Sequence, residues 1–200
     1  HSMMPKHVDS ANLRVQIGQG AKAYKASIFN IGAMSFGSLS ANAVLALNQG
    51  AKMGGFAQNT GEGGLTRYHL EAGADVIWQI GTGYFGCRNL DGTFSPQKFQ
   101  EKARLDQIKM IEIKISQGAK PGHGGILPAA KLTKEIAEIR GVQMGQSVIS
   151  PPGHSAFSTP IELLEFVAKL RDLSGGKPVG FKLCVGKPRE FVAIVKAMHK

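Results

Sequence analysis

The sequence predicts an α/β fold in which helices pack outside a parallel sheet. Short apolar runs alternate along the chain with longer segments whose apolar residues recur at helical spacing. Glycine-rich loops follow two of the apolar runs, as expected where strands deliver loops to one edge of a sheet. With 200 residues, of which 42% are hydrophobic, the chain is long enough to bury a core.

The expected strands are the short apolar runs. They are Ile28–Met34, Phe56–Ala57, Val76–Ile80, Met110–Ile115 and Val179–Val185. A further short strand is expected at Val148–Ile149, inside an otherwise irregular segment from 143 to 152. Residues 5–22 are polar, and we expect them to be irregular.

The expected helices are located by their start and stop residues. They lie at about 39–53, from Pro96, at about 131–140, from Thr159 to the Gly175-Gly176 pair, and from Pro188. Ser95 is expected to cap its helix, and Thr159 with Glu162 forms a capping box. Gly54-Gly55 is expected to end the first helix.

The alternation amounts to about four β/α units, which is half of a parallel (β/α)8 barrel. We expect one barrel domain over residues 28–200, preceded by an irregular segment over residues 1–27. His1-Ser2-Met3 resembles an expression-tag scar, and no capping glycine follows the last helix before Lys200. We therefore expect a fragment of a longer protein.

The charge and the cysteines restrict the function classes. The net charge is +10, but the basic residues are scattered and not interleaved with aromatic residues, which argues against a nucleic-acid partner. Attraction of small anions explains the charge equally well, and a basic solvated surface stays open as a third interpretation. Cys87 and Cys184 lie in no metal-ligand spacing, so a reducing cytoplasm is the simplest location. No apolar run has the length of a membrane span, although an anchor upstream stays open.

Two glycine-rich loops are the main functional features. Residues 57–64 carry Glu62, and residues 112–125 carry Lys120. Glycine lets backbone N–H groups approach a ligand closely, so the pair predicts a site for a flat or anionic small molecule. His69, His123 and His154 lie in no metal-ligand spacing, and we interpret them as loop residues, with His123 close to the substrate.

Four motifs in a fixed order give the chain a resemblance to a known family. They are Ala33-Met-Ser-Phe-Gly37, Asn59-Thr-Gly-Glu-Gly-Gly64, Gln117-Gly-Ala-Lys-Pro-Gly-His-Gly-Gly125 and Ile149-Ser-Pro-Pro152. The chain resembles the FMN-binding synthase domain of glutamate synthases. Its Tyr84–Arg88 segment is most similar to the smaller stand-alone members. The resemblance implies a (β/α)8 barrel with its site at the carboxyl ends of the strands.

The resemblance also implies a reaction. In the family, ammonia condenses with 2-oxoglutarate, and a hydride from reduced FMN converts the imine to L-glutamate. The electrons come from NADPH or ferredoxin through an iron–sulfur cluster. The cysteine ligands of that cluster, and the loops that bind the FMN phosphate, would lie beyond this chain. The implied fragment is therefore inactive by itself, and its open sheet edge predicts self-association. No glutaminase nucleophile is recognisable, so the ammonia source stays open.

The resemblance assigns five residues to the flavin. Ala33, Met34 and Ser35 match the first-strand motif that lies against FMN, and Gln79 and Lys182 match positions that face the flavin. A lysine near the flavin ring stabilises the negative charge of its reduced form. The alternative for Lys182 is a lysine at the barrel rim.

The resemblance assigns other residues to the substrate. Glu62 matches a glutamate near the amino or imino group, although a turn-stabilising role is its alternative. Lys120 and Arg140 match residues that hold the substrate carboxylates, and the second loop adds Gly124 and Gly125. The alternative for Arg140 is a charge that complements the end of its helix.

Three departures from the family pattern concern the substrate. Ile126 stands where the family usually has glutamine, His123 where glutamate is common, and Tyr84 where an arginine is usual. The loss of a polar contact at Ile126 leaves open which keto acid or amino acid is used. Two other functions stay open: a flavin-free phosphate-binding barrel enzyme, and a non-catalytic module that binds anions or nucleic acid.

Overall fold

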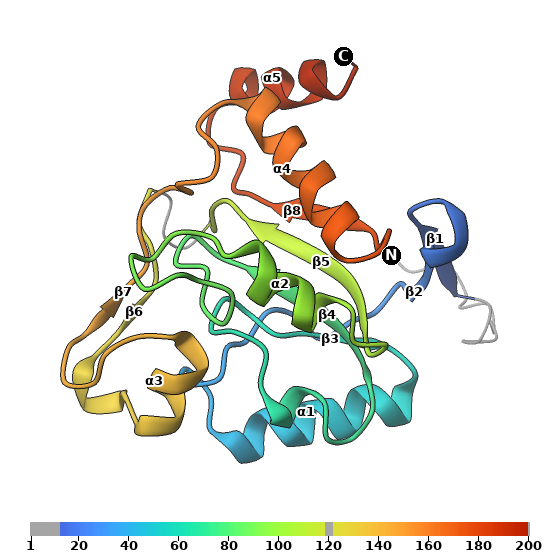
Figure 1. The fold of residues 1–200 in the computed structure, drawn as a ribbon. Helices are drawn as coiled ribbons and strands as arrows, with labels where there is room; N and C mark the ends of the chain where they lie inside the picture. The colour runs from blue at the N-terminus through green and yellow to red at the C-terminus, as the bar shows by residue number, and fades with distance from the viewer. Residues whose placement is uncertain (1–12, 119–121, 200) are drawn as a thin grey trace, which may run out of the picture.

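A parallel four-stranded sheet lies at the centre of the computed structural model, which describes residues 13–118 and 122–199 (Figure 1). Its strand order follows the chain: β3 (Ala57–Asn59), β4 (Asp75–Ile80), β5 (Ile108–Lys114) and β8 (Val179–Lys182). Two short antiparallel pairs accompany it, β1 (Arg14–Ile17) with β2 (Tyr24–Ser27) and β6 (Ile126–Leu127) with β7 (Val148–Ile149). The predicted α/β class, the parallel sheet and the short strand at 148–149 are confirmed.

Within the described residues, five α-helices accompany the strands, together with short 3-10 turns. They are α1 (Ala41–Gly54), α2 (Pro96–Ala103), α3 (Lys134–Arg140), α4 (Pro160–Leu173) and α5 (Pro188–Met198). The predicted caps are confirmed. The Ser95 side chain accepts a hydrogen bond from the backbone N–H of Lys98, and Thr159 and Glu162 form a reciprocal capping box. Gly55 follows α1 in the left-handed conformation, as a helix-ending glycine does.

The two faces of the sheet differ in chemistry. On β4, Trp78 and Ile80 point outward into an apolar core formed with α2 and α4, whereas Gln79 points to the opposite face. On β5, Ile111 and Ile113 join the same core, and Glu112 and Lys114 alternate with them. A sheet with one apolar, helix-covered face therefore presents a row of polar side chains on its other face.

A hairpin that the sequence analysis missed closes one end of this polar face. Residues 5–22 were expected to be irregular, but β1 pairs with β2 and a 3-10 turn (Gly20–Lys22) joins them. Tyr24 and Ala26 pack on Ala57 and, with Ile77 and Met110, form a separate small core. The alternating pattern is only four residues long in each strand, so it does not stand out in a polar context.

Two other expectations need correction. Residues 28–34 are not a buried strand: Ile28 and Phe29 are exposed, and a single bridge joins Ile31 to Gln58 of β3. The helix expected at 131–140 begins only at Lys134, after a 3-10 turn (Ala129–Lys131), because Thr133 caps it.

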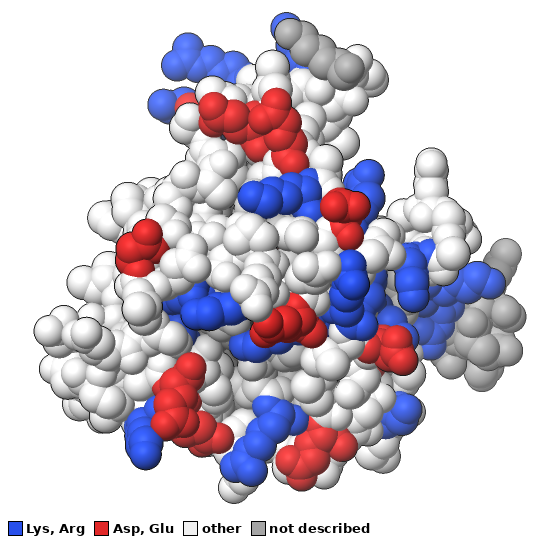
Figure 2. All heavy atoms as spheres, in the orientation of Figure 1, with Lys and Arg blue, Asp and Glu red and all other residues white. Residues whose placement is uncertain are grey.

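Charged side chains are mixed on the surface that Figure 2 shows. Lys and Arg alternate there with Asp and Glu and form no continuous basic stripe on this face. This distribution agrees with the expectation that the positive charge is scattered. No helix in the described part of the chain is long and apolar enough to cross a membrane.

His69 was expected in a loop but is fully buried in a 3-10 turn (Arg67–His69), where its Nδ1 accepts a hydrogen bond from the Thr66 N–H. Burial lowers its pKa from 6.5 to about 4. On acidification, the His69 imidazole is therefore protonated at a higher pH in the unfolded chain than in the folded chain. The free energy of unfolding consequently falls as the pH drops from 6.5 towards 4. We expect a loss of about 2 kcal/mol between about pH 7.5 and 5 from this group.

Urea unfolding at both pH values tests this expectation, with the His69→Asn variant as the control. Asparagine retains an acceptor for Thr66 but cannot titrate, so the variant should lose less stability on acidification than the parent chain. Equal losses in the two proteins would contradict the assignment.

Candidate functional site

A cavity of about 260 Å³ opens at the carboxyl ends of the parallel strands, which is where β/α proteins place their ligands. It collects side chains from the 33–39 segment, both glycine-rich loops and the ends of β4, β5 and β8. The residues that line it are Ala33, Met34, Ser35, Ser38, Leu39, Gly61, Glu62, Gln79, Lys114, Gln117, Gly125, Ile126 and Lys182.

A larger cavity of about 420 Å³ lies near the opposite ends of the strands, beside the β1–β2 hairpin. Its buried polar groups are already partnered. The Tyr24 hydroxyl donates to Asp75 at 2.8 Å, and the Lys177 ammonium group donates to the carbonyls of Ala103 and Leu105. We therefore assign the candidate site to the smaller cavity.

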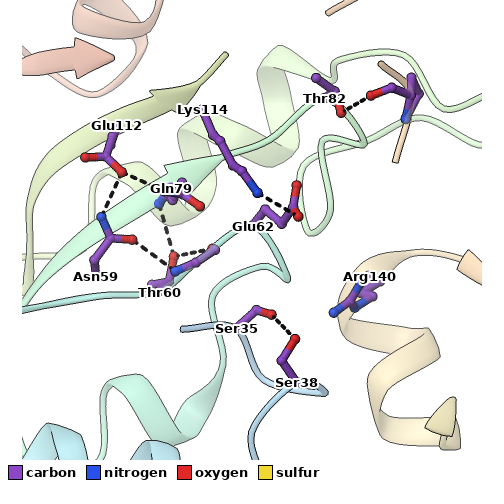
Figure 3. Close-up of polar contacts among 12 residues, drawn as sticks. Ser35, Ser38, Asn59, Thr60, Glu62, Gln79, Thr82, Glu112, Lys114 and Arg140 are labelled. Carbon is purple, nitrogen blue, oxygen red and sulfur yellow. Dashed lines mark hydrogen bonds and ion pairs between the residues drawn. The ribbon is translucent and has the colours of Figure 1, made fainter. Parts of the chain in front are cut away.

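A mostly buried ion pair is the central polar contact of this cavity (Figure 3). The Lys114 Nζ lies 2.9 Å from the Glu62 Oε1, and the two side chains are only 12% and 15% exposed. Glu62 was predicted from its glycine-rich loop, whereas Lys114 was not predicted as a site residue. The alternation Ile-Glu-Ile-Lys at the end of β5 was the available indication, because it turns Glu112 and Lys114 to the same face.

Two lysines lie side by side at the carboxyl end of the sheet. Lys114 on β5 and Lys182 on β8 are register partners in parallel strands, so their side chains leave the same face, and both line the cavity. Glu62 balances one of the two positive charges. The side chains that line the cavity thus carry an excess of positive charge, and this excess favours an anionic ligand.

A network of hydrogen-bonded side chains lies beside the ion pair (Figure 3). Glu112 Oε1 accepts from the Gln79 amide at 2.6 Å and from the Asn59 amide at 2.9 Å. Asn59 in turn accepts the backbone N–H of Gly61 at 3.0 Å, and Thr60 accepts the N–H of Gln79. This network fixes the first glycine-rich loop and the Gln79 side chain relative to the sheet.

Two glycines let the loops approach one another closely. Gly61 has φ +65°, and a Cβ there would lie 2.6 Å from the Ser35 backbone nitrogen, so only glycine allows residues 33–35 to lie against this loop. A Cβ on Gly125 would collide with the Glu62 carboxylate. The close approach brings the second loop directly against the central ion pair.

Arg140 lies behind the loops and is not among the residues that line the cavity. Its side chain is buried, its Nη2 donates to the Phe36 carbonyl at 3.2 Å, and its guanidinium lies 5.0 Å from the centre of the Phe85 ring. Its Nε has no hydrogen-bond partner among the described residues. Burial lowers the pKa of Arg140, and the charge of Glu62 partly opposes that shift.

The remaining expected site residues are distributed as follows. Gly124 packs against the backbone of Ser150, which leaves no room for a side chain, and His123 is exposed. Lys120 lies outside the described residues. In the described ranges, no group of three or more His, Cys, Asp and Glu side chains could hold a metal ion.

The fold and the cavity define a class of protein: an α/β protein with a cavity, lined by two lysines and a glutamate, at the carboxyl edge of a parallel sheet. A comparison with protein families makes the class specific. The family described as the conserved region in glutamate synthase matches residues 14–200, so the chain belongs to the glutamate synthase family. The resemblance predicted from the four motifs is thereby confirmed.

Curated proteins give the same result. The chain is 50% identical over 169 residues to the glutamate synthase large subunit-like protein YerD of Bacillus subtilis, an alignment that covers 84% of this chain and 32% of that protein. It is 36% identical over 152 residues to the archaeal-type glutamate synthase [NADPH] of Thermotoga maritima, covering 76% and 27%. It is 34% identical over 179 residues to the archaeal glutamate synthase [NADPH] of Methanocaldococcus jannaschii, covering 89% and 32%. The chain thus spans about a third of these relatives or less.

Proposed function

We propose that this chain forms part of the FMN and keto-acid site of an oxidoreductase that converts 2-oxoglutarate to L-glutamate by reductive amination. One observation carries the proposal. Residues that the resemblance assigned from separate motifs, namely Ala33–Ser35, Glu62, Gln79, Gly125 and Lys182, all line one cavity. The convergence of these matched residues on one cavity supports a shared function.

The proposed architecture is the first half of a (β/α)8 barrel over residues 28–200. The strand order β3-β4-β5-β8 follows the chain, and all neighbours are parallel, as in a barrel wall. The polar face of the sheet would then line the barrel interior, with the β1–β2 hairpin at its floor. The free edge of the sheet at β8 also supports the proposed self-association of the isolated chain.

The donor set of the cavity fits a flat, anionic cofactor such as FMN. Two lysine ammonium groups supply positive charge, and Gly61 lets the 33–35 backbone lie close against the loop. The volume is slightly below the usual range of small-molecule sites, about 300 Å³ and upward, so we assign it to part of the ligand. Bound FMN would supply hydride chemistry, Lys182 would balance charge on the ring, and the Glu112 network would hold Gln79 in place.

The keto acid would occupy the same cavity. Glu62, held by Lys114, is placed to carry a proton or to stabilise a cationic imine, and Lys114 offers a positive charge to a carboxylate. We propose Lys120 and Arg140 as further carboxylate ligands; Arg140 would act from behind the loop, where its Nε has no hydrogen-bond partner among the described residues. Ile126, which is 62% exposed at the cavity, bears on which keto acid is accepted.

Segments outside this chain would complete the protein. The names of two of these relatives specify NADPH. On that ground we propose NADPH as the electron source, with ferredoxin as the alternative. An iron–sulfur cluster that carries these electrons would be ligated elsewhere in the polypeptide.

Replacing Lys182 with methionine should weaken FMN binding by roughly 10- to 100-fold, because a hydrogen bond to a charged group is lost. Titration of the apoprotein with FMN, followed by flavin fluorescence, measures the effect. The control is Lys187→Met, which removes an exposed lysine a few residues further along the chain. Unchanged affinity in the Lys182 variant would remove this residue from the flavin site.

Anaerobic reoxidation tests the whole proposal. The complete polypeptide that contains this chain is reduced with dithionite and mixed with 2-oxoglutarate and ammonium. We expect the flavin absorbance to return and L-glutamate to form in equal amount. A flavin that stays reduced with 2-oxoglutarate and with other keto acids would contradict the proposed reaction.

A further inference from the structure

A chain of two hydrogen bonds, through His154, leads from a buried tyrosine to the backbone beside the central ion pair. The Tyr84 hydroxyl accepts the backbone N–H of Ala156 at 3.1 Å and lies 3.0 Å from the His154 Nδ1. The His154 Nε2 lies 2.8 Å from the carbonyl oxygen of Lys114. The loop after β4, the end of β5 and the 150–158 loop are thereby tied together.

The direction of each hydrogen bond follows from the groups involved. A carbonyl oxygen can only accept, so the His154 Nε2 carries a proton and donates it to Lys114. In the neutral ring the Nδ1 is then an acceptor, and the Tyr84 hydroxyl donates to it. Burial lowers the pKa of His154, which favours this neutral form, while nearby Glu62 acts in the opposite direction.

The tyrosine at the far end of the chain is held in an uncommon backbone conformation. Tyr84 has φ +48°, the only positive φ of a non-glycine residue in the described ranges, and its side chain is completely buried. Its ring packs edge-on against Phe94 and Phe166, and the His154 ring stacks on Phe157 at 4.7 Å. Strained residues persist where the surroundings hold them, and such residues concentrate at functional sites.

We propose that His154 is a positioning residue of the candidate site: it fixes the backbone at Lys114 and so directs the Lys114 ammonium group towards Glu62. Tyr84 acts through His154 by holding its ring in place, while the Lys114 carbonyl sets the tautomer. This inference rests on the proposed function only in treating the Lys114–Glu62 pair as part of the working site. The geometry of the pair itself is independent of any cofactor.

Two variants of similar size separate the two contacts of the histidine. In His154→Gln, the amide nitrogen can take the place of Nε2 and keep the donor to Lys114. In His154→Asn, the shorter side chain reaches the place of Nδ1, so the contact to Tyr84 is kept and the donor to Lys114 is lost. A stabilising role alone would make both variants lose stability without distinguishing them at Lys114.

The first readout needs no flavin. The side-chain ¹⁵Nζ resonance of Lys114, assigned by its loss in Lys114→Arg, should be unchanged in His154→Gln and shifted towards that of a free lysine in His154→Asn. Urea unfolding of both variants shows whether stability accounts for the difference. An unchanged Lys114 resonance in His154→Asn, or equal shifts in both variants, would overturn the proposal.

The second readout is turnover of the complete polypeptide. We expect His154→Asn to lower kcat/KM roughly 10- to 100-fold and His154→Gln to stay near the parent, because small misplacements of a catalytic group have effects of this size. Absence of turnover in the parent protein would contradict the proposed reaction, whereas equal turnover in all three proteins would contradict the positioning role.

Discussion

Glu62→Gln should reduce turnover of the complete polypeptide by roughly 100- to 10,000-fold, the usual contribution of a positioned acid or base. The carboxylate lies in the cavity with only 15% of its side chain exposed, and glutamine keeps its shape while removing its charge. The same change leaves the ammonium group of Lys114 buried without its counter-charge, which disturbs the site further.

Steady-state kinetics at saturating ammonium measure this loss, and the flavin content of the variant shows whether the site still assembles. The matched control is Glu138→Gln, which removes an exposed carboxylate on α3 that does not line the cavity and should leave turnover unchanged. If the Glu62 variant retained turnover within about threefold of the parent, Glu62 would have no role as an acid or base.

Trp78→Ala should lower the free energy of unfolding by about 3–5 kcal/mol. Trp78 is fully buried on the outer face of β4 and stacks on Phe99 of α2, with ring centroids 5.2 Å apart. Alanine would leave a large cavity at the contact between the sheet and its covering helix.

Urea unfolding measures the loss, with two controls. Trp78→Phe keeps an aromatic ring on Phe99 and removes an indole N–H that has no partner in the described residues, so it should cost much less. Leu90→Ala truncates a fully exposed side chain and should leave stability unchanged. A Trp78→Ala variant as stable as Leu90→Ala would show that this core does not hold the sheet and helix together.

Local patterns predicted the parts of the fold that depend on local chemistry. Capping at Ser95 and Thr159 is decided within four residues of the chain, and both caps are present. The β1–β2 hairpin and the exposure of Ile28 depend instead on contacts with residues far along the chain, such as Ala57 and Gln58. Such contacts leave only short or ambiguous patterns in the sequence.

The same division applies to the candidate site. The family resemblance located Glu62, Gln79 and Lys182, and all three line the cavity. Lys114 escaped notice because its importance comes from register: it lies beside Lys182 across two strands that are 68 residues apart, at 114 and 182. His154 escaped because its partners, Tyr84 and the Lys114 carbonyl, come together only in the folded chain.

The most direct test of the central claim is the visible absorption spectrum of the complete polypeptide, purified without added cofactor. We expect the two absorption bands of oxidised flavin, and denaturation should release this flavin as FMN. The purified Lys182→Met variant should carry less flavin than the parent protein. A colourless, folded protein that also fails to take up added FMN would contradict the claim that this cavity is a flavin site.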